Sequence, residues 1–251
     1  MIWEIFTQKI FFYLLFFAIA FTYSMVGLGG GTAYTAILTI TNTPYKIIPS
    51  TALFLNMVVS IISFLNYRAY FPSERKSLIL LVYLFGGGGT ILGANLNIKE
   101  KTFFIILGIA LILSAIISFL NDFGSKKINF KIKKKSLPLI SFPIGILAGI
   151  TGIGGGIYLS PLLIFSDFPT KGIASITSLF VFLNSFLGFS TKFFKGEFNF
   201  HFAIPILIFV IAGALLGSRL GSIKFKPQVI KFFLNLIILN IGGYSLWKGI
   251  S

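Results

Sequence analysis

The sequence predicts an all-α polytopic membrane protein of about eight transmembrane spans, built as two duplicated halves. Three observations lead to this prediction. The chain is too apolar to fold in water, its apolar runs have the length of membrane spans, and three motifs recur at a near-constant spacing. Each half is expected to open with a helix that is broken by glycine or is re-entrant.

The composition excludes a soluble fold. Of the 251 residues, 56% are hydrophobic and only 11% are charged, and the mean hydropathy is +0.95. A soluble domain carries roughly 25% charged residues, so this chain could not cover its surface with water-compatible groups. The formal net charge is +15, but the basic residues cluster between apolar runs, which is the loop pattern of a membrane protein. We therefore expect a lipid bilayer, and no nucleic acid, around this chain.

The apolar runs follow one another along the whole chain, and most approach the roughly 20 residues that cross a hydrocarbon core. They cover residues 10–40, 49–67, 77–96, 102–120, 137–165, 172–191, 202–220 and 229–247. The first and fifth runs are too long for one straight span and too short for two. Each contains a glycine cluster, at 27–31 and 152–156. A broken helix or a re-entrant hairpin explains the unusual length.

The two halves of the sequence are copies of one another. Gly31 corresponds to Gly156, the motif at 51–54 to that at 177–180, and the motif at 89–93 to that at 213–217. A near-constant spacing at three separated motifs is typical of a tandem duplication.

The duplication sets the expected boundaries. We expect a first repeat at 1–121, a basic linker at 122–136 and a second repeat at 137–251, each repeat with about four spans. Because positively charged loops prefer the cytoplasm, the linker is expected to be cytoplasmic.

The relative orientation of the repeats stays open at this stage. Counting Lys and Arg on alternate sides gives about 13 against 8 if each glycine run is one span, and about 14 against 7 if it is a hairpin. Both distributions are acceptable. Four spans per half would make the repeats parallel, whereas hairpins would make them inverted.

The glycine clusters point to anion binding. Glycine inside an apolar run frees backbone amides at membrane depth, which is tolerated where they face protein, a cavity or a ligand. Helices beginning at Thr32 and Ile157 would point their N-terminal amides and positive dipole ends at that cavity. Close helix packing on small residues is the alternative interpretation, but recurrence in both halves favours a binding site. The run 86–89 lacks a full counterpart and is assigned to packing.

Polar side chains inside the apolar runs complete the candidate substrate site. Each needs a partner, and a hydroxyl or amide can donate either to an oxyanion or to a neighbouring helix carbonyl. The candidates are Gly29, Gly30, Gly31, Thr32, Thr51, Asn56, Gly154, Gly155, Gly156, Ser175, Thr177, Ser178 and Asn184. Arg219, near the end of the seventh run, either snorkels to the interface or attracts anions to the pathway entrance.

The sequence lacks the residue patterns that thiol catalysis, metal binding and an intramembrane carboxylate relay require. The chain has no cysteine, which excludes thiol catalysis and thiolate metal sites. The six acidic residues fall in termini or loops, so no carboxylate relay lies inside the membrane. His201 is the only histidine and sits beside an interface, without an H-E-x-x-H motif. We expect no catalytic residue, no metal and no cofactor, and an enzyme is disfavoured.

The second half carries an ordered set of motifs, with glycines at 152–156, Pro161-Leu162-Leu163, then Thr177-Ser178-Leu179 and finally 213–217. This set resembles the sulfite exporter TauE/SafE family, whose pattern is a duplicated glycine-rich element followed by a proline and later by a Thr-Ser pair. The first half departs from the pattern, because Ala36 stands where Pro161 does and Ala52 where Ser178 does.

The resemblance implies a multi-pass permease of the inner (cell) membrane for sulfite, organosulfonates or related small anions. Together with the glycine breaks, it predicts a secondary carrier or facilitator of a small anion. An anion channel with the same lining and a non-transporting membrane scaffold are the alternatives. The sequence leaves open the anion, the direction of transport, any coupling ion and the oligomeric state.

Overall fold

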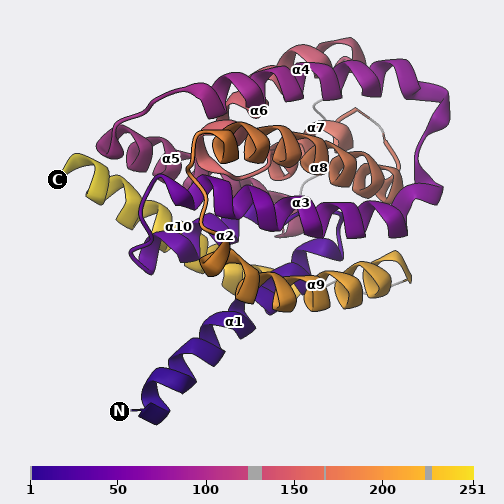
Figure 1. The fold of residues 1–251 in the computed structure, drawn as a ribbon. Coiled ribbons are helices and arrows are strands. Elements are labelled where there is room, and N and C mark those ends of the chain that lie inside the picture. Colours follow the sequence, from indigo (N-terminus) through magenta and orange to yellow (C-terminus); the bar gives the residue numbers. More distant parts are fainter. Residues whose placement is uncertain (1, 124–131, 167, 224–227) are drawn as a thin grey trace.

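The structure is a computed structural model that describes residues 2–123, 132–166, 168–223 and 228–251 (Figure 1). All regular secondary structure in these ranges is helical, which confirms the all-α class. The α-helices are α1 (Ile2–Ser24), α2 (Gly31–Ile40), α3 (Ile47–Tyr67), α4 (Lys76–Asn95), α5 (Glu100–Phe123), α6 (Leu137–Thr151), α7 (Gly156–Ile164), α8 (Thr170–Phe194), α9 (Phe200–Ile223) and α10 (Gln228–Ile250). Residues 124–131 of the expected linker 122–136 lie outside the described residues.

Several of these helices have the properties of membrane spans. Among the described residues, five segments are long and apolar enough to cross a bilayer: Ile47–Tyr70, Ser73–Asn95, Glu100–Leu120, Thr170–Phe194 and Phe200–Ile223. Shorter apolar helical segments cover Ile10–Ser24 and Gly31–Ile40. The polytopic membrane class is therefore supported, while the number of about eight spans stays a prediction. Large apolar side chains point outward, among them Leu84 at 60% and Ile208 at 65% exposure, as a lipid-facing surface requires.

Helices α3 and α8 pack antiparallel in the middle of the bundle (Figure 1). At one end, Ser50 of α3 donates a hydrogen bond to the backbone carbonyl of Glu197, just beyond α8. At the other end, Lys171 Nζ of α8 donates to the Tyr70 hydroxyl at 3.0 Å. We call these two ends of the molecule the Glu197 end and the Tyr70 end.

Helices α4 and α6 pack side by side and run in the same direction. Ser141 Oγ donates to the carbonyl of Val82 at 3.0 Å. Further along, a methyl group added to Gly145 would lie 3.0 Å from the backbone nitrogen of Thr90. Such close approach needs small residues at the contact, as is common between membrane helices. Both helices therefore start at the Tyr70 end, where Arg75 stacks on Phe168 at 4.7 Å.

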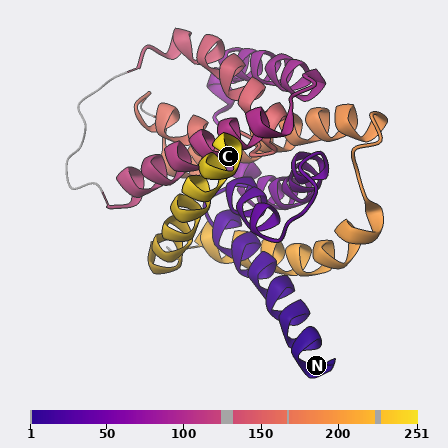
Figure 2. The ribbon, with the colours of Figure 1, turned by 90° about the vertical axis from the view of Figure 1, so that its left-hand side faces the viewer.

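Helices α1 and α9 form a second parallel pair on the same principle. A methyl group added to Gly213 would lie 3.0 Å from Ala20 Cβ, and one added to Gly221 would meet the backbone of Met25. Since α9 starts directly after the loop that holds Glu197, both helices run from the Glu197 end to the Tyr70 end. Helix α10 lies antiparallel beside α5 (Figure 2), and Asn235 Nδ2 donates to Ser118 Oγ at 2.8 Å.

Both long apolar runs are broken by glycine, as predicted. Residues 25–30 separate α1 from α2, and residues 152–155 separate α6 from α7. The residues that cap the second helices, Gly30 and Gly155, have φ angles of 89° and 81°. This left-handed conformation is accessible to glycine at little cost and strained for other residues. Helices α2 and α7 each begin one residue earlier than the sequence predicted.

The two breaks enter the molecule from opposite ends. The first starts at the Tyr70 end, where Tyr67 donates to the carbonyl of Met25. The second starts nearer the Glu197 end, where a methyl group added to Gly152 would lie 2.7 Å from Pro49 Cα. Helix α2 then leads back to the start of α3 at the Glu197 end, and α7 leads back to the start of α8 at the Tyr70 end. Each return path is thus an irregular segment followed by a short helix.

Three glycines of the run 86–89 in α4, all but Gly88, pack against neighbouring helices, as expected. A methyl group added to Gly89 would collide with the carbonyl oxygen of Phe142 and lie 3.1 Å from the nitrogen of Ile146, whereas one added to Gly88 would have no neighbour within 4 Å. These two adjacent glycines thus form a matched pair for experiment.

We expect Gly89→Ala to destabilise the protein by about 1–3 kcal/mol, because the added methyl group forces α4 away from α6. Gly88→Ala should leave stability unchanged or raise it slightly, since alanine favours the helix by roughly 0.5–1 kcal/mol over glycine. Thermal unfolding of the two purified variants in detergent measures the difference. Equal melting temperatures for the two would show that this helix contact is looser than described.

Candidate functional site

The two glycine segments meet inside the bundle. A methyl group added to Gly31 would lie 2.6 Å from the carbonyl oxygen of Ile153 and 2.9 Å from that of Gly152, and one added to Gly156 would lie 3.2 Å from the side chain of Leu28. The two glycine clusters therefore lie against one another in the structure. The first amides of an α-helix have no partner within the helix and carry its positive end. Here two such ends, those of α2 and α7, converge on one region.

Asn56 of α3 lies between the two segments. Its Nδ2 donates to the carbonyl of Gly152 at 3.4 Å. A methyl group added to Gly154 would lie 2.7 Å from the same nitrogen, and one added to Gly29 would lie 2.9 Å from Asn56 Cγ. One amide side chain thus contacts the glycine segments of both halves. From this position Asn56 can contact a ligand bound at the N-terminus of α2 or at that of α7.

A set of buried polar atoms has no hydrogen-bond partner among the described residues. They are Tyr34 OH, Thr51 Oγ1, Asn56 Oδ1, Ser175 Oγ, both polar atoms of the Asn184 amide, and Ser185 Oγ. A buried polar group without a partner costs on the order of 1–3 kcal/mol, and such groups are uncommon in native proteins. Such atoms therefore mark places where a bound polar ligand would supply the missing partner.

Only part of this polar set lies at the meeting point. A methyl group added to Gly154 would lie 3.4 Å from Ser185 Oγ, and one added to Gly86 would lie 3.5 Å from Asn184 Nδ2. Ser185 therefore faces the glycine segments, while Asn184 faces α4. Thr51 and Ser175 lie nearer the starts of α3 and α8, toward opposite ends of the molecule.

Sequence analysis missed Ser185. A signal was present, because Ser185 follows Ser178 by seven residues and therefore lies on the same face of α8. The Ser185 hydroxyl has no hydrogen-bond partner among the described residues, whereas the predicted Ser178 donates to the carbonyl of Ser175 at 3.0 Å.

The predicted hydroxyls of Thr177 and Thr32 have partners too, unlike those of Thr51 and Ser175. Thr177 Oγ1 lies 2.7 Å from the carbonyl of Ile173 and 3.3 Å from that of Gly27, so it ties α8 to the first glycine segment. Thr32 Oγ1 donates to the hydroxyl of Tyr23 at 3.4 Å. In the structure these hydroxyls bond to neighbouring protein groups, and their contact with a ligand stays a prediction.

A cavity of about 290 Å³ opens at the Glu197 end. It is lined by Tyr45, Lys46, Pro49, Leu96, Asn97, Ile98, Lys99, Phe103, Ile150, Lys192 and Glu197. Two of its lining residues, Pro49 and Ile150, adjoin the second glycine segment, which starts at Gly152 beside Pro49. The cavity therefore adjoins the second glycine segment through Pro49 and Ile150.

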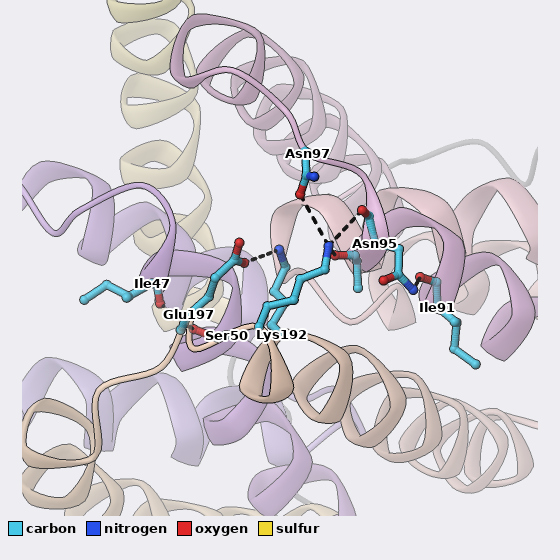
Figure 3. A network of polar contacts seen from close by, with 9 residues as sticks. Ile47, Ser50, Ile91, Asn95, Asn97, Lys192 and Glu197 are labelled. Carbon is cyan, nitrogen blue, oxygen red and sulfur yellow. Dashed lines mark hydrogen bonds and ion pairs between the residues drawn. The ribbon is translucent and has the colours of Figure 1, made fainter.

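The cavity contains an ion pair that no sequence pattern had indicated. Lys192 Nζ lies 3.1 Å from Glu197 Oε2 (Figure 3), and the two side chains are 8% and 21% exposed. Lys46 and Lys99 are exposed on the same lining. Three lysines and one glutamate are therefore among the lining residues of this cavity, and the excess of positive charge favours anions.

Arg219, the predicted entrance residue, lies elsewhere. It is exposed near the end of α9, which is at the Tyr70 end, and it is not part of the lining of the cavity. Its assignment to a pathway entrance stays a prediction.

The chain is similar along most of its length to known membrane proteins. It is 26% identical to the "Probable membrane transporter protein y4hK" of Sinorhizobium fredii, over 96% of this chain and 99% of that protein. It is also 26% identical to the "Probable membrane transporter protein YunE" of Bacillus subtilis, over 90% and 93%. With the "Probable membrane transporter protein MJ0441" of Methanocaldococcus jannaschii it shares 27% identity, over 89% and 90%. No solved structure matches the chain.

The family comparison agrees with the motifs of the glycine segments. The model of the family described as "Sulfite exporter TauE/SafE" matches residues 12–245, which is nearly the whole chain and includes both broken helices. The protein therefore belongs to the sulfite exporter TauE/SafE family of multi-pass membrane transporters.

Proposed function

We propose that the chain is a secondary transporter of a small anion such as sulfite or an organosulfonate, and that it binds this anion where the two glycine segments meet. The observation that carries the proposal is the convergence of the helix ends of α2 and α7 on Asn56 and Ser185. The Ser185 hydroxyl, which can donate, is buried without a partner among the described residues, and Asn56 Nδ2 carries a second hydrogen besides the one that it donates to Gly152. The family description supports sulfite or a chemical relative as the cargo.

Such a site suits a transported anion on electrostatic grounds. Each helix N-terminus carries a partial charge of about +0.5, so two of them offset much of a monoanion's charge. Backbone amides, the Asn56 amide and the Ser185 hydroxyl supply hydrogen-bond donors without a formal charge. A full positive charge in the same place would itself need a partner when the anion leaves. Helix ends do not, and release is therefore easier.

We propose further that the two halves are inverted repeats. The helix pairing supports this. Helix α4 of the first half packs on α6, the first helix of the second half, and α9 of the second half packs in the same way on α1, the first helix of the first half. Helices α3 with α8 and α5 with α10 then pair each helix with its own counterpart. Inverted repeats commonly enclose a central site to which the two sides gain access in turn. The Tyr70 end, where the described residues 132–136 of the basic linker lie, is then cytoplasmic, and the cavity at the Glu197 end faces the outside of the cell membrane.

The proposed orientation can be tested with single cysteines, because the chain has none of its own. Asn97 lines the cavity, and Lys135 precedes α6 at the opposite end. We expect a membrane-impermeant thiol reagent, added to intact cells, to label Asn97→Cys and to spare Lys135→Cys until the cells are opened. Labelling of both from the outside would contradict the inverted arrangement.

The transport proposal is tested with the purified chain in liposomes and a panel of sulfite, sulfate, sulfoacetate, thiosulfate and small carboxylates. We expect saturable uptake of one or more of these anions, together with counterflow of labelled anion against unlabelled anion inside. Flux without saturation or counterflow would identify a channel instead. Absence of flux for every anion of the panel would refute transport of these anions and favour a scaffold.

Ser185→Ala tests the central site. Loss of one hydroxyl donor worth about 0.5–1.5 kcal/mol raises the half-saturating anion concentration roughly 2–10-fold. The melting temperature should not fall, because the hydroxyl has no partner among the described residues. The control is Ser63→Ala, whose hydroxyl is also buried but donates to the carbonyl of Val59 at 2.9 Å. The same half-saturation in wild type and Ser185→Ala would remove Ser185 from the site.

A further inference from the structure

The cavity at the Glu197 end holds a lysine that is withdrawn from the surface. Lys192 is 7% exposed, and it is one of the residues that line the cavity. A cation in such a place needs an anionic partner, which is the Glu197 carboxylate at 3.1 Å. Lys192 also lies in the last turn of α8, where the negative end of the helix favours a positive charge. The position of the cation is therefore supported by the protein independently of Glu197.

The backbone around Glu197 is held in place by contacts to three other helices. Ser50 of α3 donates to the Glu197 carbonyl, and Lys195 Nζ donates to the carbonyl of Asn95 at 2.8 Å, at the end of α4. The ring of Phe198 packs on that of Phe200 of α9 with centroids 4.7 Å apart. The loop is thus fixed.

The carboxylate itself is less constrained than its loop. The Glu197 side chain is 21% exposed and is part of the cavity lining, and Figure 3 shows its carboxylate pointing to the Lys192 ammonium group. By rotation of its own side chain, the carboxylate can leave Lys192 and bind water instead, with no movement of the backbone. Lys192, at 8% exposure, has no comparable access to water. The carboxylate is therefore the exchangeable member of the pair.

We propose that Lys192 is the first binding site for the transported anion, and that the anion takes the place of the Glu197 carboxylate on the Lys192 ammonium group. This inference rests on the proposed function. A sulfonate or sulfite offers the same oxygen acceptors as a carboxylate, so Lys192 stays paired before and after the exchange. Lys46 and Lys99 on the same lining raise the local anion concentration.

The entry site adjoins the central one. Pro49 lines the cavity and also packs against Gly152, whose carbonyl accepts the hydrogen bond of Asn56. An anion released from Lys192 therefore leaves it in a cavity that adjoins the second glycine segment. Return of the Glu197 carboxylate to Lys192 behind it restores the ion pair, which favours release of the anion from Lys192.

The test uses the full chain in liposomes with Asn97→Cys as the only thiol, since Asn97 lines the same cavity. The rate at which a negatively charged methanethiosulfonate reagent modifies this cysteine is measured against sulfoacetate concentration. We expect sulfoacetate to slow the reaction. Adding Lys192→Gln should raise the half-protecting concentration at least tenfold, and adding Glu197→Gln should lower it several-fold because the competing carboxylate is gone.

Two variants control for folding and for net charge. Lys192→Arg keeps the positive charge and should retain protection to within a few-fold. Lys171→Gln removes an exposed lysine at the Tyr70 end and should leave protection unchanged. Protection that persists in Lys192→Gln would overturn the proposal. So would a Glu197→Gln variant that loses protection as fully as Lys192→Gln does, because the pair would then be structural.

The same measurement separates this inference from the proposed function, since protection needs no transport. Protection that depends on Lys192, in a chain that moves no anion, would support the entry site and refute transport. Transport with no protection at any sulfoacetate concentration would refute the entry site and leave the proposed function standing.

Discussion

The contact on which the rest of the structure depends is that between Gly31 and the carbonyls of Gly152 and Ile153. Backbone that leaves a helix inside an apolar protein loses its regular hydrogen bonds, and water is absent to replace them. Two such segments are tolerable here because each faces the other. The approach is possible because residue 31 has no side chain, and the amide of Asn56 reaches a carbonyl of the second segment. Without this contact, neither break would be stabilised at the centre of the bundle.

The helix pairs around the centre hold the two breaks at that level. Helix α6 is locked to α4, and α1 to α9, through glycines at which a methyl group would strike the opposite backbone. Because the contacts are between backbones, they permit little sliding of one helix along the other. The positions at which α1 and α6 end are therefore determined by α9 and α4. The proposed ligand site thus depends on an apolar packing arrangement at some distance from it.

Much of the fold could be predicted because its signals are local. The breaks at 25–30 and 152–155 follow from glycines in apolar runs, and the starts of α2 and α7 were predicted to within one residue, since a left-handed φ is a property of a single residue. The path of each break could not be predicted, because run length alone does not tell a span from a return.

The candidate site was less predictable, because its contacts join residues that are distant in sequence. Asn56 and the glycines were recognised from their types, but the bond of Thr177 to Gly27 and the free hydroxyl of Ser185 depend on neighbours distant in sequence. Lys192 and Glu197 each look like ordinary loop-side charges in the sequence. Their burial beside one another becomes visible only when α3 and α4 are placed around them.

The exchange of helix partners between the halves has a consequence for biosynthesis. Helix α1 ends at Ser24, whereas the surface that it packs against belongs to α9, which begins at Phe200. At about 5–20 residues per second, a ribosome needs on the order of 10–40 s to make the intervening chain. Throughout that time α1 sits in the membrane with its packing face uncovered. The first half of this protein is thus an unfinished fold, and assembly of the centre waits for one of the last helices to be synthesised.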